Sequence, residues 1–159
     1  MTASVQSVIN NPENVANSGD LEMNWAMKAY EHAETYFNII CSVDPTLLKL
    51  TQNDDAIYSK FKKDFRCFKL DVLDEEQLKS AGAKVAWREF CEHFKDEVES
   101  HNFGTLIRLN CKEGYSDKNS IFGYRVQFLA IEIARNREGL NSDLRFTQKS
   151  NTREHTADT

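Results

Sequence analysis

The chain has 159 residues and a formal net charge of −5, and 40% of its residues are hydrophobic. This length and composition indicate one domain with an apolar core and exclude a wholly disordered chain. The mildly acidic charge gives no general attraction to phosphate backbones or anionic lipid, so we expect no direct contact with nucleic acid. We also expect no contact with a membrane, because no apolar run approaches the roughly 18 residues that a membrane span needs.

The N-terminal third of the chain predicts a flexible leader followed by one long helix. Residues 1–19 are polar and carry no aromatic residue, which is typical of a flexible segment. Asp20 is a good N-cap, and we expect a helix from there to Cys41. It should end near Ser42, because Asp44 precedes Pro45 and a pre-proline residue avoids the α region. Its apolar face repeats at three- or four-residue steps: Leu21, Trp25, Ala29, Ala33, Phe37 and Ile40.

The middle of the chain predicts two further helices and a short strand. We expect a helical turn over Pro45–Leu50 and a helix that starts near Asn53 or Asp54. The alternating segment Lys69–Val72 predicts a strand. Asp74 should cap the next helix, which Gly82 divides into two pieces.

The last third predicts the rest of the sheet and the final helix. Leu106–Asn110 has the pattern of a second strand, and Leu144–Thr147 that of a third. Between them we expect a helix over Ile121–Glu138, with Gly139 as its C-cap. Residues 149–159 should form a flexible tail.

The expected fold class is therefore α+β. It is a mainly α-helical single domain over residues 20–148, with about four main helices and a small antiparallel sheet.

The sequence shows no familiar catalytic or cofactor motif. The six glycines are too scattered for a dinucleotide or phosphate loop, and the four cysteines contain no CxxC pair. We interpret the cysteines as reduced thiols of a cytoplasmic protein, with the nucleus left open. Cys91 and His93 point to different sides of a helix, so we expect no metal site. Because the sequence has no glycine loop, we also expect no cofactor.

Seven residues are candidates for binding a partner macromolecule. The final helix ends in Arg135, Asn136 and Arg137, planar donors that suit a carboxylate-bearing surface. The alternative is a solvated helix face on which Glu132 pairs with a neighbouring arginine. His32 is either part of such a surface or a satisfied boundary histidine. The full set is Trp25, Lys28, His32, Arg125, Arg135, Asn136 and Arg137.

Three long segments carry a resemblance to a known family. They are NWAMKAYEHAETYFNIICSVDPTLLKLTQNDDAIYSKF, FGTLIRLNC and IFGYRVQFLAIEIARNREG, in that order. Together they resemble the polysaccharide biosynthesis domain-containing protein family, over roughly Leu21 to Gly139.

The resemblance implies a function in protein folding. Small cytosolic members of the family act as dedicated chaperones of translation elongation factor 1-alpha. They engage its nascent GTP-binding domain near the ribosome, alongside the nascent-polypeptide-associated complex, and release it when GTP completes the fold. We therefore expect a non-enzymatic chaperone.

Two alternatives remain open. The family name suggests a sugar- or polysaccharide-modifying transferase. A methyltransferase of this kind would need a cofactor-binding glycine loop on a parallel sheet, and the sequence shows neither. The chain could also be a scaffold for another protein partner.

Overall fold

Four main helices pack around one small antiparallel sheet in the computed structural model, which describes residues 12–148. This confirms the predicted α+β single domain. The sheet has two strands within the described residues. A further helical turn covers residues 144–148. The other elements are α2 (Pro12–Ile40), the 3-10 helix η1 (Pro45–Leu47), α3 (Asp54–Asp64), α4 (Glu76–Lys79), α5 (Ala81–His93), β1 (Gly104–Arg108), β2 (Ser120–Tyr124) and α6 (Arg125–Arg137).

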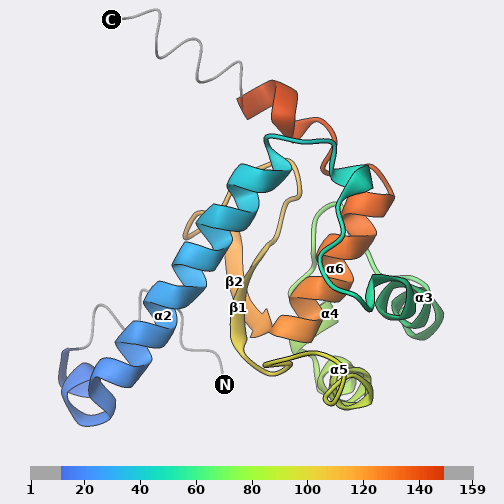
Figure 1. The fold of residues 1–159 in the computed structure, drawn as a ribbon. Coiled ribbons are helices and arrows are strands. Elements are labelled where there is room, and N and C mark those ends of the chain that lie inside the picture. Colours follow the sequence, from blue (N-terminus) through green and yellow to red (C-terminus); the bar gives the residue numbers. More distant parts are fainter. Residues whose placement is uncertain (1–11, 149–159) are drawn as a thin grey trace, which may run out of the picture.

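The hairpin formed by β1 and β2 separates two packing layers (Figure 1). The long helix α2 lies on one side of it, and α6 lies on the other side with α3 and α5 beyond. Strand residues alternate between the two faces. Leu106 and its cross-strand partner Phe122 pack against α2, whereas Ile107 and Ile121 belong to the main core.

The layer between α2 and the hairpin is thin because small residues build it. Ala26, Ala29 and Ala33 recur along one face of α2, and all three are buried. They form a small core with Leu106 and Phe122. Alanines at this spacing let the helix approach the sheet closely. The bulkier Trp25 packs at the edge of this contact.

The main core is rich in stacked aromatic rings. Phe61 and Phe65 come from α3 and the residue after it, and Trp87 comes from α5. The Phe65 and Trp87 rings stack with centroids 4.2 Å apart, and the Phe61 and Trp87 rings lie 5.9 Å apart. Offset stacking of this kind adds to the burial that holds α3 and α5 together.

The structure corrects the predicted start of the final helix. Residues 121–124 were predicted as its first turn, but they form β2, which pairs with β1 from Gly104↔Tyr124 to Arg108↔Ser120. Helix α6 begins at Arg125, and Gln127 accepts a hydrogen bond from the Tyr124 backbone at 2.8 Å. At the other end Gly139 has a φ of +79°, as its predicted place after the helix requires.

Two of the three predicted sheet strands are wrong. Lys69–Val72 contributes one isolated antiparallel bridge, Val72↔Asn110, because the chain turns away after it. Leu144–Thr147 is helical, and the Thr147 amide donates to the Asp143 carbonyl at 3.1 Å. A buried Leu144 and an exposed Phe146 fit a helical turn and not a strand, because residues two apart on a strand share one face.

The other helix boundaries agree with the sequence in part. Helix α2 begins at Pro12 rather than Asp20, so part of the expected leader is helical. Residues 1–11 of that leader and the expected tail at 149–159 lie outside the described residues. Helix α3 begins at Asp54 as predicted. The predicted break near Gly82 falls at Ser80, whose side chain accepts from the Ala83 amide at 3.1 Å.

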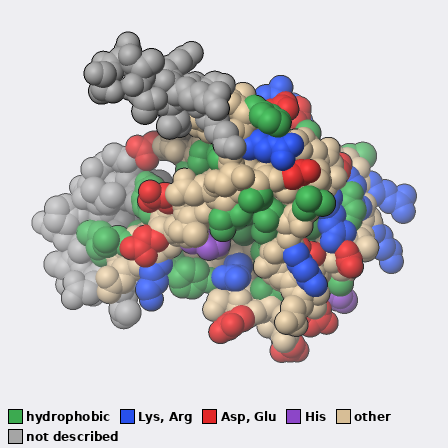
Figure 2. All heavy atoms as spheres, turned by 45° about the horizontal axis from the view of Figure 1, so that its top comes forward, with side chains coloured by type: hydrophobic (Ala, Val, Ile, Leu, Met, Phe, Trp, Pro, Cys, Tyr) green, Lys and Arg blue, Asp and Glu red, His purple; other side chains and the backbone are tan. Residues whose placement is uncertain are grey.

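Charge is unevenly distributed over the surface. Lys and Arg side chains gather on the right-hand side of the face in Figure 2, the side on which α3 lies in Figure 1. No helix within the described residues is long and apolar enough to cross a membrane.

Candidate functional site

Three of the seven candidate residues share one flank of α2. Trp25, Lys28 and His32 follow each other at helical spacing. Lys28 is exposed, whereas Trp25 and His32 are half-buried. The three side chains therefore lie along the edge of the contact between α2 and the hairpin, where a partner can reach them.

Trp25 is seated directly on the hairpin. Its ring stacks on Phe122 with centroids 4.9 Å apart, and Phe103 lies 6.3 Å away. A Cβ atom at Gly104 would lie 1.6 Å from the Trp25 ring, so only glycine allows this approach. Gly104 thus positions the tryptophan.

His32 and Arg125 meet at the start of α6. The His32 ring meets Phe128 edge-on, with centroids 5.1 Å apart. Burial, and next the positive charge of Arg125, lower the pKa of His32 and so favour the neutral imidazole. Among the described residues, neither His32 Nδ1 nor Arg125 Nε has a hydrogen-bond partner, although both atoms are buried.

Two exposed aromatic residues extend this surface. Phe103 and Tyr124 are 36% and 46% exposed. Because Tyr124 pairs with Gly104, its side chain shares the α2-facing side of the hairpin. The sequence predicts neither residue as part of a binding surface. Its pattern puts Tyr124 inside a helix and leaves Phe103 outside any element. We call this surface the aromatic–basic face: Trp25, Lys28, His32, Phe103, Tyr124 and Arg125.

The charged end of α6 has a different role. Arg135 is fully buried and Asn136 is 2% exposed, so neither side chain can reach a partner in this fold. Arg135 donates to the backbone carbonyls of Leu70 at 2.8 Å, Arg108 at 2.9 Å and Leu109 at 2.9 Å. The planar donors identified in the sequence are therefore used inside the molecule.

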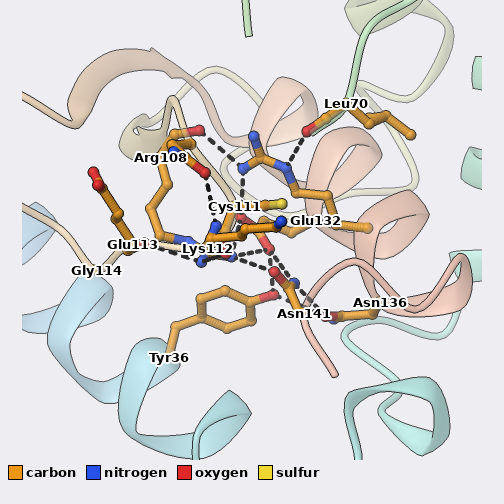
Figure 3. Close-up of polar contacts among 12 residues, drawn as sticks. Tyr36, Leu70, Arg108, Cys111, Lys112, Glu113, Gly114, Glu132, Asn136 and Asn141 are labelled. Carbon is orange, nitrogen blue, oxygen red and sulfur yellow. Dashed lines mark hydrogen bonds and ion pairs between the residues drawn. The ribbon is translucent and has the colours of Figure 1, made fainter. Parts of the chain in front are cut away.

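Glu132 is the centre of this buried network (Figure 3). Its carboxylate accepts from Arg108 Nη2 at 2.9 and 3.0 Å and from Arg135 Nη1 at 3.1 Å. It also accepts from the Tyr36 hydroxyl at 2.8 Å and from Asn141 Nδ2 at 3.0 Å. The network therefore connects α2, β1, α6 and the segment after α6.

The neighbouring charges determine the ionisation state of the network. Burial alone would raise the pKa of Glu132, but Arg108 and Arg135 outweigh it and lower the pKa to about 2. Burial, and next the charge of Glu132, raise the pKa of Tyr36 well above its ordinary value. At neutral pH the tyrosine is a donor and the glutamate an acceptor, which is the pattern that the hydrogen bonds require.

Arg137, the last of the seven candidates, is exposed and lies away from the aromatic–basic face. Its guanidinium donates to Asp55 at 2.6 Å and covers the Tyr58 ring at 5.2 Å from the centroid. Both contacts belong to α3, so Arg137 joins α6 to α3.

The neighbouring Asp54 is buried and has a structural role. Its carboxylate accepts hydrogen bonds from the Leu50 and Thr51 amides at 2.8 and 2.7 Å.

No group of three or more His, Cys, Asp or Glu side chains that could hold a metal ion occurs within the described residues. On α5, Cys91 is buried and His93 is exposed, so they do not converge.

Comparison with known proteins gives one family and one fold. The family model described as PBDC1 protein matches residues 21–146. Protein PBDC1 from Homo sapiens is 57% identical over 129 residues, which cover 81% of this chain and 55% of that protein. Protein PBDC1 from Mus musculus is 55% identical and is covered over 66% of its length. The chain thus spans between about half and two thirds of these two relatives.

Yeast relatives match over most of their length. The PBDC1 homolog from Schizosaccharomyces pombe is 41% identical over 133 residues, which cover 81% of this chain and 90% of that protein. A Saccharomyces cerevisiae protein solved by solution NMR is 40% identical, with a TM-score of 0.73 over 79% of this chain and 89% of the other.

Proposed function

The chain belongs to the PBDC1 family, polysaccharide biosynthesis domain containing, and from this premise we propose that it is a client-specific cotranslational chaperone. Its client is the nascent GTP-binding domain of translation elongation factor 1-alpha, which it releases when that domain has folded. It acts by binding, without catalysis and without a cofactor of its own.

The aromatic–basic face is the observation that supports this proposal. Trp, Tyr, Phe and Arg are the residue types enriched in protein–protein interfaces, and Lys28 adds charge at the rim. The Trp25 ring stacks on Phe122 and lies against Gly104, so this side chain is in position before a client arrives. A side chain that is already ordered loses little entropy on binding.

Release needs no nucleotide site on this chain. GTP binds the folded client and not the unfolded one, so it stabilises the folded state by RT ln(1 + [L]/Kd). The client then leaves a chaperone that prefers the unfinished domain. We further propose that the chain acts in the cytoplasm near the ribosome, alongside the nascent-polypeptide-associated complex.

Binding to the client domain tests where contact occurs. We expect Lys28→Glu and Tyr124→Ala to weaken binding of the nucleotide-free GTP-binding domain about tenfold each, a loss of about 1.4 kcal/mol. Lys118→Glu is the matched control, since Lys118 is an exposed lysine in the loop before β2. Arg137→Glu serves as a competing variant. If only Arg137→Glu weakens binding, the client contacts α6 and α3 instead of the aromatic–basic face.

Depletion in cells tests the function itself. Newly made elongation factor 1-alpha should become insoluble when the protein is removed, and the Tyr124→Ala variant should restore its solubility less well than the unmodified protein. Normal solubility and abundance of the factor after depletion would contradict the chaperone proposal.

A further inference from the structure

A second surface lies away from the aromatic–basic face, where the end of α3 meets α5. An open groove there is lined by Lys63, Phe65, Arg66, Cys67, Phe68 and Gly82, among others. In Figure 1 this part of the molecule lies on the right, whereas α2 lies on the left. The aromatic–basic face does not use any of these residues.

The groove has a fixed apolar floor. Phe65 and Phe68 are half-buried, and both rings lie against Trp87, with centroids 4.2 and 5.8 Å away. The Trp87 indole donates to the Gln77 carbonyl at 2.9 Å, which holds the ring in place. The floor is therefore a preformed surface on which an apolar side chain can pack.

Side-chain hydrogen bonds also fix the wall of the groove. Gln77 Oε1 accepts from the Lys69 amide at 2.7 Å, and Gln77 Nε2 donates to the Lys69 carbonyl at 3.2 Å. This pair ties the segment after α3 to α4, so the groove keeps its shape without an occupant.

The rim of the groove is positive although the chain as a whole is acidic. Among the described residues, Lys63 and Arg66 form no ion pair, and both are exposed. The one acidic residue lining the groove, Asp64, is bound to Lys60 at 2.8 Å. Lys63 and Arg66 therefore border an apolar floor, and no residue that lines the groove offers them a free carboxylate.

We propose that this groove binds an acidic linear peptide segment of a partner protein, with an apolar side chain seated on Phe65 and Phe68 and carboxylates against Lys63 and Arg66. Charge complementarity favours an acidic occupant, and the apolar floor suits an apolar side chain of a peptide. The net charge of −5 works against a phosphate backbone.

Gly82 offers a way to close the groove without disturbing the fold. A Cβ atom at this position meets nothing within 4 Å, so a larger side chain enters open space. Gly82→Trp should fill the groove. Gly82→Ala is the matched control, because it adds a methyl group and removes the helix penalty of glycine while leaving the floor open.

Peptide selection on the whole chain tests the proposal. A displayed library of random peptides is panned on the unmodified protein, and the enriched peptides are then measured against variants by fluorescence anisotropy. We expect acidic peptides with an apolar anchor. Their affinity should fall at least about tenfold in Gly82→Trp and in the Lys63→Glu, Arg66→Glu double variant, and stay unchanged in Gly82→Ala and Lys118→Glu.

The exposed thiol of Cys67 gives an independent readout. A bound peptide should slow alkylation of Cys67 in the unmodified protein and not in Gly82→Trp. Enrichment of basic peptides, binding that survives Gly82→Trp, or displacement of the peptide by single-stranded RNA would overturn the proposal. Gly82→Trp should leave binding of the elongation-factor domain intact, so the two proposals fail separately.

Discussion

Glu132 is the carboxylate partner of two buried arginines, Arg108 and Arg135. Its side chain and those of Arg108 and Arg135 are all fully buried. A buried ion contributes little when it is fully paired, but removal of one partner leaves an uncompensated charge. The effect of Glu132 on stability should therefore be largest when it is removed, because its two arginine partners then remain as buried, unpaired charges.

Glu132→Gln should lower the free energy of unfolding by about 3 kcal/mol or more, because two guanidiniums then lack their carboxylate. The pKa of about 2 lies below the ordinary value of 4.5, so the stability from this group is full above pH 4.5. It is lost as pH falls towards 2. Urea unfolding at several pH values measures both effects.

The control for this experiment is Glu113→Gln, which changes an exposed glutamate. Its unfolding free energy should match that of the unmodified protein. If Glu132→Gln lost stability with falling pH as steeply as the unmodified protein between pH 4.5 and 2, another carboxylate would be responsible for the acid sensitivity.

Gly104 is the second residue with a sharp expected effect. Gly104→Ala places a methyl group against the Trp25 ring, and overpacking of this kind costs about 1–3 kcal/mol. Chemical unfolding should show the loss, and tryptophan fluorescence should shift as the ring leaves the hairpin. Gly82→Ala adds the same methyl group in open space and should leave stability unchanged or slightly higher. Equal losses in the two variants would contradict the steric account.

Sequence reasoning could locate Arg135 but not its surroundings. An arginine near a helix end is normally exposed, and the carbonyls that it contacts come from segments about 26 to 65 residues away. Trp25, Lys28, His32 and Arg125 were predicted as binding residues, and the structure brings them to one edge, although their contact with a partner stays a prediction. Phe103 and Tyr124 could not be predicted, because only the packing of Phe103 near Trp25 and the pairing of Tyr124 with Gly104 place them there.

At the scale of elements, periodicity predicted the helices well and the sheet poorly. Phe122, Val126 and Leu129 continue a helical spacing through the junction of β2 and α6, so the pattern alone favours one long helix. Pairing with β1 supplies hydrogen bonds and buries Ile121 in the main core, and this tertiary gain outweighs the local pattern. Strand propensity is decided by such context.

The close contact between α2 and the hairpin gives a prediction at this scale. Ala29→Leu adds volume to a layer built from alanines and should destabilise the protein by about 1–3 kcal/mol. Hydrogen exchange should then speed up first in β1 and β2. Ala56→Leu, on the exposed side of α3, is the matched control and should leave the exchange unchanged. If the hairpin of Ala29→Leu exchanged as slowly as that of the unmodified protein, α2 would contribute little to the stability of the hairpin.

The whole molecule shields its four thiols to different degrees. Cys67 is exposed, Cys41 is half-buried, and Cys91 and Cys111 are buried. Burial, and next the charge of Glu92, raise the pKa of Cys91 to about 12, so almost no thiolate exists at neutral pH.

Thiol titration with a disulfide reagent should therefore show one fast group, one slower group and two that react only on unfolding. Cys67→Ser should remove the fast phase. The remaining phases should become fast together in urea, at the concentration at which tryptophan fluorescence reports unfolding. Rapid reaction of Cys91 in the native protein would contradict the packing described here.

The buried network also constrains how this chain can be made. Tyr36 and Asn136 are bonded across 100 positions of sequence, and Tyr36 and Glu132 across 96. During synthesis α2 leaves the ribosome long before its partners exist, and Asn141 comes later still. Contacts this distant must wait for loop closure over most of the chain. The buried network can therefore be completed only after Asn141 has been made, and α2 has no sheet to pack against until β1 has been made.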